Sequence, residues 1–156
     1  GNAAKDATLK NIEASNTWAF FQAKNMRRHV LRLQASEYET LLATQPALDP
    51  GARQSILDKI ADYKAQDAKL TSDPDKKEGL DELWVKGKAL EAERDEALQK
   101  DPYFDYAEAL LQIAIVLASV AILAGGTSLL IGSGILGALG VIATVGGFTL
   151  AFPLPL

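Results

Sequence analysis

The sequence predicts an all-α membrane protein, in which a long-helix, coiled-coil-like antiparallel bundle is followed by a transmembrane helical hairpin. The first observation is that no charged residue lies beyond Glu108, so the last part of the chain is apolar or small. The second is that the earlier part is rich in charge and spaces its apolar residues at steps of three and four. The third is that short proline-containing breaks divide this earlier part into helix-sized pieces. We therefore assign residues 1–100 to a charged helical bundle outside the bilayer and residues 101–156 to the hairpin.

The first helix is predicted over residues 3–45. Along it, a row of residues has the heptad spacing of a coiled coil for about seven helical turns. Asn16 lies at a core position of this row, where a polar residue often sets register and strand number at some cost in stability. The spacing predicts that the row packs against another helix. The row consists of Leu9, Ile12, Asn16, Ala19, Ala23, Met26, Val30 and Leu33.

A second group of apolar residues gives this helix an apolar surface on more than one side. It is a strip formed by Phe20, Leu31, Tyr38 and Leu42, with Trp18 and Phe21 nearby. Because one partner helix cannot cover both surfaces, we expect a bundle. The expected oligomer or partner interface consists of Asn16, Trp18, Phe20, Phe21, Met26 and Val30.

Two further helices are predicted in the charged part of the chain. Pro46 ends the first helix, and a corner over residues 47–51 leads into a helix at residues 52–70. A break at residues 71–75, with Pro74 in the first turn of the next helix, leads into a helix at residues 75–99. The inward residues of the helix at 52–70 are predicted to be Ile56, Ile60, Tyr63 and Leu70. Those of the helix at 75–99 are predicted to be Leu80, Leu83, Leu90 and Ala97.

The hairpin is predicted to span the bilayer at residues 104–123 and 129–152, with residues 125–128 as the turn. A bilayer core needs roughly 20 apolar residues in a helix, and each segment supplies them. Asp101 is expected to cap the first span, with Pro102 at its first helical position. Tyr103 and Tyr106 then lie where an interfacial belt of aromatic residues belongs.

Small residues form one narrow row on each predicted span. In lipid, helices associate where small residues let their backbones approach, since apolar side chains gain nothing by leaving the lipid. The two rows favour a tight antiparallel hairpin, and the alternative is that glycine and alanine are simply common in such helices. The rows are Ala114, Ala118, Ala121 and Gly125 on the first span, and Ser133, Gly137, Gly140, Thr144 and Gly147 on the second.

The first span also carries a polar face, formed by Glu108, Gln112 and Ser119. Ionisable groups at membrane depth are costly and often mark functional sites. Glu108, however, lies only one turn inside the predicted boundary, and the second span carries no charge. We interpret this face as an interfacial anchor or a helix–helix hydrogen-bonding surface, with a pore or ion path as the alternative.

The composition gives no indication of catalysis. The chain has no cysteine and a single histidine, His29, so it lacks the clusters that hold zinc and the pairs that activate a thiol. Its 16 basic and 20 acidic side chains provide no basic excess for nucleic acid. GSGILG lacks the preceding strand of a dinucleotide-binding loop. We expect no enzyme, no cofactor, no metal site and no nucleic-acid partner.

Two stretches of the chain resemble the signatures of a family of bacterial inner-membrane proteins of unknown function. They are SNTWAFFQAKNMRRHVLRLQ, with its WAFFQAK motif, and ALEAERDEALQKDPYFDYAEALLQIAIVLASVAIL. The resemblance implies an N-terminal membrane helix, a charged helical middle and a C-terminal helical pair. Because Gly1 lies about where that first helix would end, the resemblance implies a further span upstream. It also implies that the bundle lies in the periplasm, and it brings no activity.

The function predicted from these features is that of a non-enzymatic, membrane-anchored helical scaffold that forms a homo-oligomer. The scaffold would lie in the lipid of the bacterial inner membrane. One alternative is an accessory subunit of a larger membrane complex, contacted through Trp18, Phe20 and Phe21. A second alternative is an oligomeric pore lined by the polar face of the first span.

Overall fold

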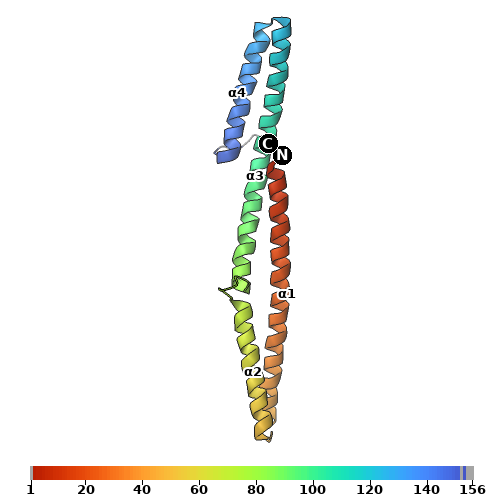
Figure 1. The fold of residues 1–156 in the computed structure, drawn as a ribbon, viewed down its shortest axis with the longest axis vertical. Helices are drawn as coiled ribbons and strands as arrows, with labels where there is room; N and C mark the ends of the chain where they lie inside the picture. Colours follow the sequence, from red (N-terminus) through yellow and green to blue (C-terminus); the bar gives the residue numbers. More distant parts are fainter. Residues whose placement is uncertain (1, 152, 154–156) are drawn as a thin grey trace. The chain divides into compact units, whose positions relative to one another are not determined.

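The computed structural model describes residues 2–151 and 153, and these residues form four α-helices and no strand. The helices are α1 (Asn2–Thr44), α2 (Pro50–Thr71), α3 (Leu80–Ala124) and α4 (Thr127–Thr149), as Figure 1 shows. The all-helical class expected from the sequence is confirmed. The second predicted span ends at Thr149 in the structure, and Phe152, its expected last residue, lies outside the described residues.

The chain divides into two compact units, and both α1 and α3 contribute to each. Unit 1 comprises Gly1–Asn11 and Glu91–Leu156, and unit 2 comprises Ile12–Leu90. Unit 1 therefore holds the first turns of α1, the apolar part of α3 and all of α4. Unit 2 holds the rest of α1, all of α2 and the start of α3.

The core of unit 2 contains many of the inward residues predicted for α2 and α3. Ile60 of α2 and Leu80, Leu83 and Leu90 of α3 are all buried. On α1, however, the buried residues of this unit are Ala14, Thr17, Leu31 and Ala35. The helices of unit 2 thus pack on a face of α1 that does not include the predicted heptad row.

The connection from α1 to α2 is short and capped. α1 ends at Thr44, and Asp49 is the N-cap of α2. Its carboxylate oxygen accepts hydrogen bonds from the backbone N–H groups of Gly51 and Ala52, at 3.0 and 3.3 Å. Pro50 occupies the first turn, where a missing N–H leaves no hydrogen bond unmade.

The third helix begins at Leu80 and not near residue 75, because the preceding residues form a compact turn. Lys77 has a positive φ of 54°, which a continuing helix does not allow. A Cβ at Gly79 would lie 2.6 Å from the Cα of Ser72, so only glycine fits where these two parts of the backbone approach each other. The Glu82 carboxylate holds the turn by accepting the Ser72 hydroxyl at 2.6 Å and the Asp73 backbone N–H at 3.2 Å.

Glu82 makes the stability of this turn depend on pH. The hydrogen bond from Ser72 holds the pKa of Glu82 below its usual range. A depressed pKa adds stability above the unfolded-state value, and this contribution is lost as the pH falls through the folded-state value. Glu82→Gln should therefore lower the melting temperature at pH 7. Near pH 3 the melting temperatures of the variant and the parent protein should be similar. The measurement is thermal unfolding followed by circular dichroism.

The control for this prediction is Asp81→Asn, which removes the same charge one residue away. It should change the melting temperature by less than Glu82→Gln at pH 7. Equal effects of the two variants would mean that overall charge matters and that the hydrogen bond from Ser72 does not.

Pro102 does not start a helix, because α3 continues through it without a break. A proline inside a helix removes one backbone donor, and α3 tolerates this loss. Asp101, the expected N-cap of the first span, instead accepts the backbone N–H of Ala4 at 3.0 Å. It therefore caps the first turn of α1, where the N–H groups lack partners within their own helix.

The turn between α3 and α4 is shorter than predicted. Gly125 has a φ of +64°, a left-handed conformation that glycine adopts without strain, and Gly126 is the N-cap of α4. α4 then runs back along the last part of α3 in unit 1 (Figure 1). The two apolar segments thus form an antiparallel hairpin.

Candidate functional site

The apolar hairpin of unit 1 packs through small residues. Gly140 lies so close to α3 that a Cβ there would stand 2.8 Å from the Cγ of Leu111 and 3.4 Å from the carbonyl oxygen of Ala107. A Cβ at Gly147 would stand 3.0 Å from the Cβ of Tyr103. At these positions the absence of a side chain lets the two helices approach.

The predicted small-residue rows lie partly in this contact. Ala114 faces Gly137, since a Cβ built at Gly137 lies 3.9 Å from the Cβ of Ala114. Gly125 lies in the turn and is exposed. Of the other predicted members, Ala121, Ser133, Gly140 and Gly147 are buried, and Ala118 and Thr144 are half-buried.

Several residues of the hairpin contact were missed from the sequence. Tyr103, Ala107, Ala143 and Gly146 are buried in unit 1 but were not in the predicted rows. The signal was present on α3, because Ala107, Ala114 and Ala121 repeat every seven residues. That repeat shares Ala114 and Ala121 with the predicted row and extends it to Ala107, one heptad toward the start of the span.

Outside this contact, the hairpin exposes most of its apolar surface. α3 and α4 are each long and apolar enough to cross a membrane, by length and composition. Only 17% of the apolar window of α3 and 22% of that of α4 are buried within the protein. A helix from the core of a water-soluble protein would bury most of such a window. The large exposed side chains include Ile115, Val116, Ile122, Leu123, Ile131, Ile135, Val141, Val145 and Phe148.

The predicted polar face of α3 is exposed in the structure. The Gln112 amide donates to the Glu108 carboxylate at 3.0 Å, and the Ser119 hydroxyl donates to the backbone carbonyl of Ile115 at 2.8 Å. All three side chains lie outside the contact with α4. Their donors are satisfied within their own helix, and the carboxylate of Glu108 keeps further capacity to accept hydrogen bonds.

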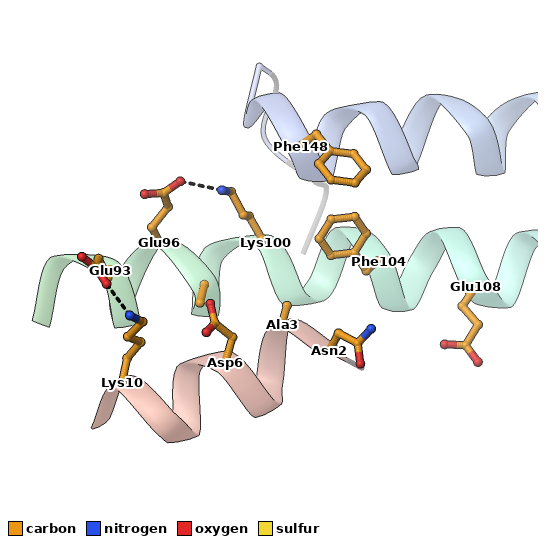
Figure 2. A pocket seen from close by; sticks show the side chains of 11 residues that line it. Asn2, Ala3, Asp6, Lys10, Glu93, Glu96, Lys100, Phe104, Glu108 and Phe148 are labelled. Carbon is orange, nitrogen blue, oxygen red and sulfur yellow. Dashed lines mark hydrogen bonds and ion pairs between the residues drawn. The ribbon is translucent and has the colours of Figure 1, made fainter. Parts of the chain in front are cut away.

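Unit 1 also contains a cavity of about 640 Å³ between the first turns of α1, the middle of α3 and the end of α4. Figure 2 shows the rings of Phe104 on α3 and Phe148 on α4 next to each other, and they meet edge to face with ring centroids 5.2 Å apart. Six of the other lining residues carry charged side chains. The lining residues are Asn2, Ala3, Asp6, Lys10, Glu93, Glu96, Ala97, Lys100, Phe104, Glu108 and Phe148.

The charged groups of this cavity are largely occupied with one another. Lys10 pairs with Glu93 at 2.7 Å, and Lys100 pairs with Glu96 at 2.5 Å (Figure 2). None of the lining residues is a histidine, a cysteine or a serine, so the cavity holds no serine hydroxyl or cysteine thiol beside an imidazole base. Among the described residues, no group of acidic, histidine or cysteine side chains is placed to hold a metal ion.

The aromatic residues of the predicted interface separate into two groups in unit 2. Trp18 and Phe21 are half-buried and join Trp84 of α3 in one cluster, with ring centroids 5.2 to 5.9 Å apart. A Cβ at Gly87 would lie 2.7 Å from the Trp18 ring. Lys88 lies over both tryptophan rings, at 5.7 and 5.6 Å. The cluster therefore joins α1 to α3 within the unit.

The other predicted interface residues are exposed. Asn16, Phe20, Met26 and Val30 all lie on the surface of α1 in unit 2. The Lys24 ammonium lies 4.7 Å from the centre of the Phe20 ring and also donates to the backbone carbonyl of Glu78. The large members of the heptad row in this unit are exposed too, so the helices of unit 2 leave this row uncovered.

Comparison with known proteins identifies a family but no activity. The model of one family, described as Domain of unknown function (DUF4337), matches residues 1–150. No curated protein and no solved structure matches the chain.

Proposed function

Since the chain belongs to this family of unknown function, which supplies no activity, we propose from its structure that it is a non-enzymatic, membrane-anchored helical scaffold. The observation that carries the proposal is the small buried share of the apolar windows of α3 and α4. Apolar surface of this extent is unfavourable in water, at roughly 25 cal/mol per Å². A bilayer core removes that cost for the whole hairpin at once.

In this proposal the hairpin crosses the membrane, and unit 2 lies outside the bilayer and binds partners. The charges of the chain support this division, because none lies beyond Glu108. We assign the membrane to the bacterial inner membrane and unit 2 to the periplasm, as the resemblance to inner-membrane proteins implies. The scaffold acts by holding partners, so the proposal needs no catalytic residue, cofactor or nucleic acid.

The test uses single-cysteine variants, which report one site each because the chain has no cysteine. Val116→Cys on α3 and Val145→Cys on α4 are compared with Val85→Cys in unit 2. These valines are 61%, 55% and 68% exposed in the protein alone, so a water-soluble maleimide would reach all three similarly. In native membranes, we expect labelling at Val85→Cys only, with the other two labelled after detergent and denaturant are added.

Two results would contradict the proposal. Equal labelling of all three variants in native membranes would show that lipid does not cover the hairpin. Release of the protein by alkaline carbonate would show that it is not integral to the membrane. For the periplasmic assignment, Val85→Cys should be labelled in intact spheroplasts by a reagent that does not cross the membrane, and labelling only after lysis would reverse it.

A second candidate is an accessory subunit of a larger membrane complex. The exposed polar face of Glu108, Gln112 and Ser119 favours it, since polar groups facing lipid tend to be covered by another helix. Native mass spectrometry of the gently solubilised protein separates the two. A mass that is a multiple of this chain supports the scaffold, and a mass that includes other chains supports the accessory subunit.

A further inference from the structure

One long row of apolar side chains on α1 is left uncovered within unit 2. Its large members, Ile12, Met26, Val30 and Leu33, are 47% to 67% exposed. Ala19 and Ala23 between them lie on the same face of the helix. At 3.6 residues per turn, this row lies away from the buried residues of α1, Ala14, Thr17, Leu31 and Ala35. Single exposed apolar residues are common, but a continuous row of them marks an interaction surface.

The spacing of the row indicates what kind of partner would cover it. From Ile12 to Leu33 the steps are four or three residues without exception. This is the heptad pattern of a coiled coil, continued for about three heptads and roughly 33 Å of helix. Such a length is about the minimum that predicts a stable coiled coil. The partner is therefore a helix of similar length and heptad spacing.

Asn16 identifies that helix as a second copy of the same one. It occupies a core position of the row and is exposed, and its amide both donates and accepts hydrogen bonds. In a symmetric pair, two such amides bond to each other, which fixes the register and favours two strands. Val30 and Leu33 take the β-branched and leucine core positions that also favour two strands in parallel pairs.

The residues that flank the row are compatible with this arrangement. In a parallel pair in register, Glu13 would face Thr8, and Arg27 would face Gln22. Neither of these pairs brings like charges together across the interface. Charge at these positions therefore does not oppose the self-association that the apolar row favours.

We propose that two copies of the chain associate through a parallel coiled coil of α1 over Ile12–Leu33, with the two Asn16 amides paired at its core. The parallel direction rests on the proposed function, because two copies anchored alike in one bilayer start α1 from the same side. An antiparallel pair aligned on the same row would set Asn16 opposite Met26 and Ile12 opposite Val30. That arrangement leaves a buried amide without a partner, which the parallel pair avoids.

The experiment uses oxidative cross-linking of single-cysteine variants of the full chain in native membranes. Ile12→Cys and Ala23→Cys lie on the row. Ala61→Cys on α2 is the control, since it is an exposed alanine on a helix of unit 2. We expect disulfide-linked dimers at twice the mass of the chain from the first two variants, at least tenfold more than from Ala61→Cys.

Each other outcome overturns a defined part of the proposal. Cross-linking by an Ile12→Cys/Val30→Cys double variant, with none by Ile12→Cys alone, would show an antiparallel pair. Equal yields from Ala23→Cys and Ala61→Cys would show that the row is not an interface. This failure is distinct from failure of the membrane anchor, because labelling of Val116→Cys reports the anchor separately.

A second variant tests the role of Asn16. Asn16→Val should keep the association but lose its single register, so that native mass spectrometry shows larger assemblies beside the dimer. An unchanged single mass would exclude Asn16 as the residue that sets the number of strands.

Discussion

Gly140→Val should separate the two helices of the apolar hairpin. Its Cβ would stand 2.8 Å from the Leu111 side chain and 3.4 Å from the Ala107 carbonyl oxygen, and valine adds two methyl groups beyond that. Overpacking of this kind costs about 1–3 kcal/mol, and the close backbone approach that joins helices in lipid would be lost. We expect a loss of about 2–3 kcal/mol in helix pairing, which is roughly a 30- to 150-fold change in its equilibrium.

The pairing can be measured through a disulfide inside the hairpin. A Cβ at Gly137 lies 3.9 Å from the Cβ of Ala114, a separation that a disulfide accepts. The Ala114→Cys/Gly137→Cys variant should therefore form an internal disulfide on mild oxidation, scored by the loss of two free thiols. Adding Gly140→Val should strongly reduce its yield.

Gly134→Val is the matched control for this prediction. It makes the same change on the same helix, but a Cβ at Gly134 meets nothing within 4 Å. The disulfide yield should stay unchanged. If both valines reduce the yield equally, the effect comes from the helix itself and the contact at Gly140 is not responsible.

Trp18→Ala should have the second large effect, by loosening unit 2. The Trp18 ring contacts Phe21 and Trp84 and fills the space that Gly87 leaves on α3. Removing a buried tryptophan side chain costs about 3–5 kcal/mol, and Trp18 is only half-buried, so we expect about 2–3 kcal/mol. Thermal unfolding followed by circular dichroism should show a melting temperature lower by several degrees.

Val85→Ala provides the comparison for Trp18→Ala. Val85 lies next to Trp84 on α3 but is 68% exposed, so its truncation should change stability little. A melting temperature unchanged by Trp18→Ala would show that the aromatic cluster does not hold α1 against α3. The role of Trp18 as a partner contact, which the sequence alone suggested, would then regain support.

The helices themselves could be predicted from the sequence, because their inward residues repeat at helical spacing and their ends carry proline and glycine. The spacing predicts Leu80, Leu83, Leu90 and Ala97 as inward residues, and all four are buried. The start of α3 could not be placed, since Pro74 resembles a first-turn proline. The turn depends instead on the bond between Glu82 and Ser72, which spacing does not reveal.

The sequence of α1 alone does not predict which of its apolar faces is buried. Its two apolar faces both have helical periodicity, so the sequence does not say which one the rest of the chain covers. The buried face is determined by α3, because the Trp18 ring packs against Gly87 and Trp84 of that helix. The row through Asn16 is left outside by this packing.

The uncharged turn of the hairpin bears on how the proposed insertion into a membrane would take place. Only the loop between α3 and α4 must pass through the hydrocarbon for the proposed hairpin to insert, and it consists of Gly125 and Gly126. A lysine or an aspartate at the centre of a membrane helix costs roughly 2.5–3.5 kcal/mol, and neither residue is present in this loop. Because no charge is moved across the bilayer, the membrane potential does no work on this step. Insertion of the finished hairpin should therefore proceed at the same rate in energised and de-energised vesicles.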